Sequence, residues 1–131
     1  MYRGVLFISP HPEDAAVLTQ MLDPVHVPLV HAADLGQARS RLEHDRFGVV
    51  LTEAALPDGS WRDVLDLARQ MQPRSEVIVT HPFADSRFWA EALSLGAYDL
   101  LAQPFYASEV QRIVSNVCSR PGRVQVAGVV A

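Results

Sequence analysis

Glu53 is the side chain whose position most directly implies chemistry in this sequence. It ends an apolar run (FGVVLT), and the loop sequence LPDG follows shortly after it. Ser9 follows a similar run (GVLFI), and Thr80 ends a third one (EVIVT). Because ligands of open parallel sheets gather at the carboxyl ends of the strands, we expect these three side chains to share one edge. A carboxylate placed there binds a cation or accepts hydrogen bonds.

Two loop histidines, His11 and His81, are expected at the same edge as Glu53. Imidazole and carboxylate are both ligands of Zn²⁺, so a zinc site of these three residues is one hypothesis. Loop histidines are common, and no close pair such as H-x-x-x-H occurs, which favours ordinary loop histidines. The remaining histidines are predicted to pack: His26 and His31 on the second strand, and His44 near a helix end.

Several enzyme classes lack their sequence signatures here. No G-x-G-x-x-G or G-x-x-x-x-G-K-[ST] pattern follows the first apolar run, which argues against a nucleotide cradle. No G-x-S-x-G elbow is present. Cys118 lies late in the last predicted helix, on or near its buried face, where packing is its expected role. We therefore expect a module that is not an enzyme.

The elements that must position these residues alternate along the chain. Apolar runs typical of strands occur at 4–8, 25–32, 47–52, 76–80 and 98–102, and helical periodicity occurs at 13–22, 34–43, 60–70, 85–95 and 106–118. Five strands alternating with five helices predict an α/β fold, with a parallel sheet and helices on both faces. Pro28 removes a ladder donor, so the second strand should lie at an edge.

Capping residues mark the ends of the predicted helices. Asp34, Ser60 and either Asp85 or Ser86 stand where helix N-caps are expected. Gly96 stands where a helix commonly ends in a left-handed residue.

The composition indicates one soluble domain, which we place at 1–119, with 120–131 as a tail or linker. The chain has 131 residues, 49% of them hydrophobic, and a net charge of −4. That charge argues against direct nucleic-acid binding. No apolar run approaches the roughly 20 residues that span a bilayer, so no membrane contact is expected. A single cysteine and the lack of a secretory signal pattern favour the cytoplasm.

Four motifs in this order resemble one family: VLFIS, VVLTEAALPDGSW, VIVT and LGAYDLLAQPF. Over residues 3 to about 118 the chain resembles a CheY-like receiver domain of two-component response regulators. The resemblance implies a (βα)5, flavodoxin-like, doubly wound sheet with strand order 2-1-3-4-5, and a place in phosphorelay signalling.

The resemblance also implies which residues of this chain hold the family's site positions. In the family an acidic pair and an aspartate hold Mg²⁺, and the aspartate accepts a phosphoryl group. Here Ser9 and Pro10 stand at the acidic pair and Glu53 at the acceptor. Glu13 and Asp14 come too late, on the helix.

The remaining family positions are partly kept. Thr80 holds the hydroxyl position after strand 4, and Leu100 the position of a switching aromatic. Gln103 replaces the family's lysine, and the following Pro104 is a candidate cis-proline.

The altered site predicts a divergent member that is not phosphorylated by the usual route and binds Mg²⁺ weakly or not at all, so no cofactor is expected. Glu53 would then act as a built-in partial mimic of the phosphorylated state, with Thr80 donating a hydrogen bond to it, or would merely be solvated. One alternative is a conventional phospho-acceptor that uses Glu53 or Asp58. Another is a small metal- or FMN-binding protein.

A helix 4–strand 5–helix 5 face is the expected place for protein contacts, either with a second copy or with a partner such as a histidine kinase or an output domain. Its predicted residues are Phe83, Trp89, Leu100 and Tyr106, and ordinary core packing is the alternative role for them.

Overall fold

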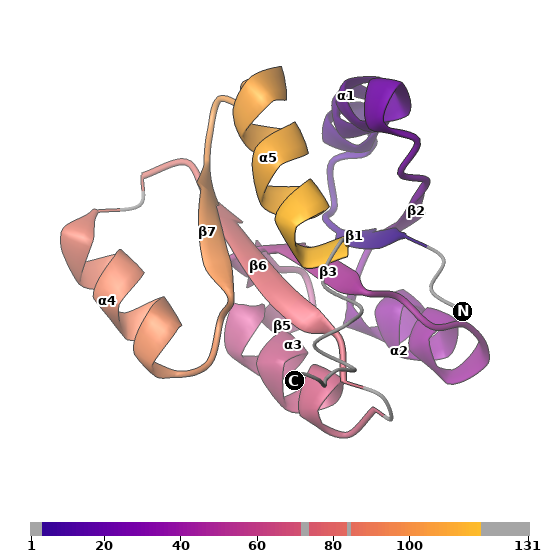
Figure 1. The fold of residues 1–131 in the computed structure, drawn as a ribbon. Helices are drawn as coiled ribbons and strands as arrows, with labels where there is room; N and C mark the ends of the chain where they lie inside the picture. Colours follow the sequence, from indigo (N-terminus) through magenta and orange to yellow (C-terminus); the bar gives the residue numbers. More distant parts are fainter. Residues whose placement is uncertain (1–3, 72–73, 84, 119–131) are drawn as a thin grey trace, which may run out of the picture.

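Five parallel strands form one sheet in the order β2-β1-β3-β6-β7, as the computed structural model shows (Figure 1). The structure describes residues 4–71, 74–83 and 85–118. The strands are β1 (Val5–Ile8), β2 (Leu29–Ala32), β3 (Val49–Glu53), β6 (Glu76–His81) and β7 (Asp99–Ala102). Counted along the chain this is the order 2-1-3-4-5, so the predicted fold class is confirmed. The predicted tail at 120–131 lies outside the described residues.

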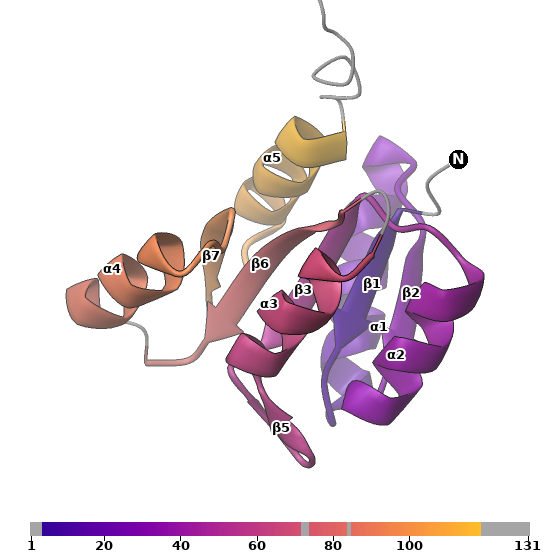
Figure 2. The same cartoon turned by 90° about the horizontal axis from the view of Figure 1, so that it is seen from below.

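Helices cover both faces of the sheet. They are α1 (Pro12–Leu22), α2 (Leu35–His44), α3 (Trp61–Arg69), α4 (Ser86–Ser94) and α5 (Ala107–Cys118). In Figure 1 α1 and α5 lie on one face, and Figure 2 shows α2 and α3 on the other, with α4 beyond them toward β7. No helix of the described residues is both long and apolar enough to cross a bilayer.

The alternation of side chains along β1 divides the interior into two cores. Val5 and Phe7 belong to the core under α1 and α5, whereas Leu6 and Ile8 belong to the core under α2, α3 and α4. All four residues are fully buried. A continuous apolar run is what such a doubly covered central strand requires.

The predicted caps are confirmed. The carboxylate of Asp34 accepts a hydrogen bond from the Gln37 amide at 2.8 Å, and that of Asp85 accepts one from the Phe88 amide at 2.9 Å. Ser60 caps α3, accepting from the Arg62 amide at 3.2 Å. Gly96, with φ +117°, follows α4 as expected.

The second strand is shorter than predicted. Residues Asp23–Val25 form a 3-10 helix, and His26 after it has a left-handed backbone with φ 60°. The strand therefore begins only at Leu29, beyond Pro28, and placing His26 on it is wrong. It does lie at the sheet edge, as Pro28 predicts.

A small hairpin follows β3 in place of the predicted loop (Figure 2). Its strands, β4 (Ala55–Leu56) and β5 (Gly59–Ser60), pair antiparallel. The Asp58 carboxylate at its tip accepts hydrogen bonds from the Leu35 and Gly36 amides at 2.9 and 3.1 Å. The hairpin is thus fastened to the first turn of α2.

Two predicted placements are wrong. Leu100 is only 1% exposed and packs in the core under α2, α3 and α4, so it offers nothing to a partner. It pairs in register with Val79, which belongs to the same core. Cys118 is exposed, because the buried side of the last turn of α5 is occupied by Val117.

Candidate functional site

The sheet register brings Ser9, Glu53 and Thr80 to the ends of adjacent strands. Ile8 pairs with Thr52, and Glu53 pairs with Thr80. Ser9 continues the β1 ladder through its amide, which donates to the Ala32 carbonyl at 2.9 Å. The edge predicted from the sequence is therefore formed by the central strands β1, β3 and β6.

Glu53 is engaged by two neighbours from the β1–α1 loop. The Ser9 hydroxyl donates a hydrogen bond to Glu53 Oε2. His11 Nδ1 lies 3.0 Å from Oε2 and 3.2 Å from Oε1. Ser9 Oγ also accepts a hydrogen bond from the His11 amide at 2.9 Å. Serine, histidine and glutamate thus form a closed hydrogen-bonded unit at the end of β3.

The loop geometry explains why His11 reaches Glu53. His11 is the N-cap of α1, with extended backbone and a proline directly after it, and its side chain makes no capping hydrogen bond. The imidazole is therefore free to face β3. The hydrogen bond that the ring donates to Glu53, and the negative charge of Glu53, raise the pKa of His11 above its usual 6.5. Ion pairing with a carboxylate favours the protonated ring.

Asp14 joins this unit, contrary to the expectation that it comes too late in the chain. It lies in the first turn of α1, and its Oδ2 is 4.0 Å from His11 Nδ1. One ligand atom from each of His11, Asp14 and Glu53 lies within 4.8 Å of the others. Burial and the charge of Glu53 raise the pKa of Asp14. The first helical turn folds back over the strand ends, which linear spacing does not reveal.

Thr80 makes no hydrogen bond to Glu53, so the predicted contact is wrong. Its hydroxyl is buried, and among the described residues it has no hydrogen-bond partner. The carboxylate of Glu53 instead lies toward the β1–α1 loop, where Ser9 and His11 bind it.

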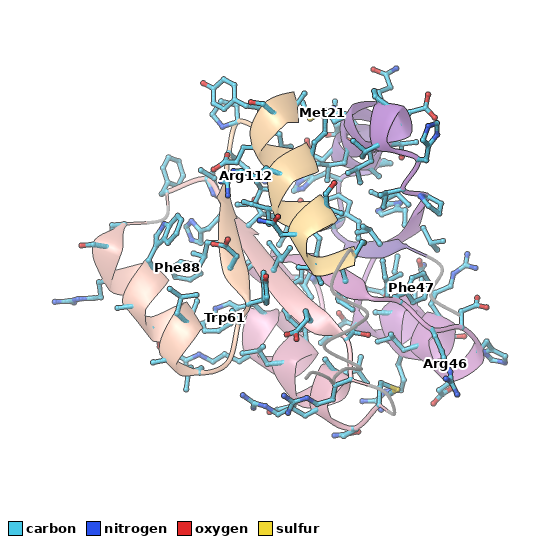
Figure 3. All side chains as sticks on the ribbon, viewed as in Figure 1. Met21, Arg46, Phe47, Trp61, Phe88 and Arg112 are labelled. Atoms are coloured by element: carbon cyan, nitrogen blue, oxygen red, sulfur yellow. The ribbon has the colours of Figure 1, made fainter. Side chains whose placement is uncertain are left out.

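His81 is not part of the cluster, so the hypothesis of a zinc site of His11, Glu53 and His81, which the sequence did not favour, is wrong. Its ring packs 4.8 Å from that of Phe88, and its Nδ1 accepts from the Phe83 amide at 2.9 Å. Phe88 in turn meets Trp61 edge-on at 5.6 Å, and Figure 3 shows both between α3 and α4. Aromatic packing holds the imidazole on that side of β6.

His31 is a supporting residue that the sequence did not identify. Its Nε2 lies 2.8 Å from the Ser9 carbonyl oxygen, to which it donates. The contact joins β2 to the turn that presents Ser9 and His11. Its position one residue before the end of a strand that neighbours β1 is the feature of the sequence that could have indicated this role.

The remaining family positions lie beside the cluster. The Gln103-Pro104 peptide is cis, as predicted. An open pocket of about 550 Å³ lies between α1 and this loop. It is lined by Asp14, Val17, Pro82, Gln103, Pro104 and Phe105. Gln103, which stands where the family has a lysine, thus lines the same pocket as Asp14.

The carboxylate of Asp58, the alternative phosphoryl acceptor, binds the first turn of α2. The two α2 amides that it binds lower the pKa of its carboxyl, with the Leu35 amide as the main cause. Its carboxylate therefore serves as a second cap for α2.

The amino-acid sequence is similar to those of two curated bacterial regulatory proteins. The chain is 26% identical over 114 residues to the response regulator protein PilR of Pseudomonas aeruginosa, covering 87% of this chain and 26% of PilR. It is 30% identical over 83 residues to the transcriptional regulatory protein DpiA of Escherichia coli, covering 60% of this chain and 37% of DpiA. The chain thus spans roughly a quarter to two fifths of these curated relatives. No protein-family profile matches it.

Solved structures of receiver domains have the same fold. The signal receiver domain of a putative LuxO repressor from Vibrio parahaemolyticus superimposes with a TM-score of 0.87 at 22% identity, covering 98% of this chain and 100% of that one. The chain has the fold of CheY-like receiver domains. A CheY-like receiver domain protein from Methanospirillum hungatei gives a TM-score of 0.81 at 17% identity over 95% of this chain and 99% of that one.

The donor set of this receiver-like domain departs from what Mg²⁺ prefers. Mg²⁺ takes oxygen ligands in near-octahedral geometry. Pro10 supplies no side-chain donor, and the Glu53 carboxylate is already bound by Ser9 and by an imidazole whose protonation it favours. These residues do not fit a magnesium site of the family's kind.

Proposed function

We propose that this receiver domain acts in signal transduction through protein–protein contact and does not accept a phosphoryl group by the family's Mg²⁺-dependent route. The observation that carries the proposal is the closed Ser9–His11–Glu53 unit at the acceptor position. A carboxylate bound by a hydroxyl and an imidazole is a poor nucleophile, because both donors withdraw its lone pairs.

Loss of cations supports the same proposal. Phosphoryl transfer depends on positive charge that neutralises the equatorial oxygens of the transition state. Pro10 removes a metal ligand, and Gln103 replaces a lysine. His11 is a possible substitute cation only while it stays protonated, and its ring is paired with Glu53.

If Glu53 mimicked a phosphorylated aspartate, we would expect a hydrogen bond from Thr80 to its carboxylate. The Thr80 hydroxyl makes no such bond. We therefore propose a domain whose conformation is independent of phosphorylation. In this proposal the module is not an enzyme, works in the cytoplasm, needs no Mg²⁺ and binds neither nucleic acid nor membrane directly.

Its contacts are proposed to use the α4–β7–α5 face, defined here by Phe83, Trp89 and Tyr106. Phe83 is 83% exposed and Tyr106 is 64% exposed, while Trp89 is half-buried. Aromatic side chains on a surface are the usual anchors of protein interfaces. The partner is either a second copy or a signalling protein such as a kinase or an output domain.

Incubation with acetyl phosphate and Mg²⁺, followed by intact-mass analysis, tests the proposal. We expect no added phosphate on the natural chain. The matched control is a variant with the family's residues restored, Ser9→Asp, Pro10→Asp, Glu53→Asp and Gln103→Lys, which we expect to gain one hydroxylamine-sensitive phosphate. Phosphate on the natural chain would instead favour a conventional acceptor. Flavin bands in its visible spectrum would favour an FMN protein.

A further inference from the structure

The proposed function uses His11 and Glu53 but leaves Asp14 without a role, although the cluster of His11, Asp14 and Glu53 brings two carboxylates and one imidazole together. Asp14 and Glu53 come from different elements, α1 and β3, and His11 lies between them. Carboxylates repel each other at close range, so a cluster of this kind is stabilised by a shared cation. Of the three, only Glu53 stands at a position where the family binds its metal.

The spacing of the three ligand atoms suits a small tetrahedral ion. With bonds of about 2.0–2.2 Å, two ligands of such an ion lie about 3.3–3.6 Å apart. His11 Nδ1 is 3.0 Å from Glu53 Oε2 and 4.0 Å from Asp14 Oδ2, on either side of that value. All three ligand atoms lie within 4.8 Å of one another, so rotation of the Asp14 side chain toward the other two would complete the set around one ion.

The surroundings are already arranged for binding. Ser9 holds both the His11 amide and the Glu53 carboxylate, which fixes the loop against the end of β3. The side chain of His11 is 52% exposed, so an ion has access and water can complete its coordination. Thr80, paired in register with Glu53, has a buried hydroxyl without a partner among the described residues.

We propose that His11, Asp14 and Glu53 form a binding site for a divalent transition-metal cation of the Zn²⁺ type. An imidazole nitrogen favours such ions over Mg²⁺, which prefers oxygen ligands alone. The metal would replace the proton shared by His11 and Glu53 and tie the first turn of α1 to β3. Three other histidines have side-chain contacts elsewhere: His31 with Ser9, His44 with Ser40, and His81 with Phe88.

Calorimetric titration of the full chain with Zn²⁺ tests the site, with Co²⁺ absorption as the second readout. We expect one ion per chain, with visible Co²⁺ bands typical of four-coordinate geometry. His11→Ala and Asp14→Asn should each weaken Zn²⁺ binding by about tenfold or more. His44→Ala, which removes an exposed histidine at the end of α2, is the matched control and should bind as the natural chain does.

Three results would overturn the site: no Zn²⁺ binding by the natural chain, unchanged binding by His11→Ala, or an equal loss in His44→Ala. A circular-dichroism melt of each variant separates lost ligands from lost folding, and Asp14→Asn keeps the shape of the side chain. A thermal shift by Zn²⁺ in the natural chain that is missing in Asp14→Asn supports the site independently. No phosphoryl donor is present in these assays, so their failure leaves the proposed function untouched.

Discussion

At the scale of single residues, the pairing of His11 with Glu53 is the contact on which the proposed departure from a conventional receiver domain rests. The imidazole stands against the carboxylate at the place where a conventional site has a metal ion. The proposed lack of phosphorylation rests on this ion pair. The protonation of the His11 ring can be measured directly.

The first prediction concerns the pKa of His11 in NMR titration of its ring signals. We expect a value above 6.5 in the natural chain, because Glu53 bonds and attracts the protonated ring. Glu53→Gln should bring it back toward that value. Asp14→Asn should lower it less, since Asp14 contributes less than Glu53.

The same shift fixes the sign of a pH effect on folding. A raised pKa means that the folded state binds the proton more tightly than the unfolded chain does. The stabilisation by the pair is thus complete below pH 6.5 and is lost as pH rises through the higher folded value. Unfolding midpoints of the natural chain and Glu53→Gln should therefore converge as pH rises through that range; a gap that widens would contradict the pairing.

The second prediction separates core from surface at two positions expected to share one face. Leu100→Ala should destabilise the domain by about 2–5 kcal/mol, because it leaves a cavity in a closed core. Phe83→Ala, at an exposed position, should change the free energy of unfolding by about 0.5 kcal/mol or less. Urea denaturation of both variants measures the contrast. Similar values for the two would mean that Leu100 is not a core residue.

At the scale of elements, entry into β1 depends on a backbone conformation that suits glycine. Gly4 has φ +102°, and an added Cβ would lie 2.4 Å from the Pro28 carbonyl oxygen. That carbonyl accepts the Val5 amide at 3.0 Å, so it cannot move away without loss of the bond that begins the β1–β2 pairing.

The third prediction compares Gly4→Ala with Gly36→Ala. Gly4→Ala should cost about 1–3 kcal/mol, because it combines a left-handed backbone with a steric clash. Gly36 lies inside α2, where the nearest atom to an added Cβ is 3.5 Å away. Its replacement by alanine should stabilise the domain by about 0.5–1 kcal/mol. Thermal melts of the two variants should shift in opposite directions; equal shifts would contradict the described geometry.

Most elements could be predicted because their periodicity is long enough to recognise. Runs such as GVLFI and helices of nine or more residues carry a clear pattern, and caps such as Asp34 and Ser60 mark their ends. The β4–β5 hairpin has only two residues in each strand, so it shows no period. The late start of β2 depends on how residues 23–28 turn, which propensity alone does not determine.

The sequence predicted those site residues whose positions are determined by the ends of the parallel strands. Ser9, Glu53 and Thr80 are placed correctly because parallel register aligns them. The third member of the cluster with His11 and Glu53 is Asp14 and not His81. Residue spacing does not reveal this, because it depends on the orientation of the first turn of α1 and on the aromatic neighbours of His81.

At the scale of the whole molecule, α4 and α5 both pack against β7 and leave aromatic side chains in the loops before them. Phe83 precedes α4 and Tyr106 precedes α5, and both are largely exposed. An ion pair between Arg62 and Glu91 anchors α4 to α3.

The fourth prediction is that this face supports association. In sedimentation velocity at rising concentration, we expect the natural chain to form a dimer and Phe83→Ser/Tyr106→Ser to remain a monomer, because burying exposed aromatic area drives such contacts. Both variant positions are on the surface, so the melting temperature should stay nearly unchanged. Val17→Ser, at an exposed apolar position on α1, is the control and should associate as the natural chain does. A natural chain that stays monomeric would exclude the second copy and leave a different signalling protein as the partner of this face.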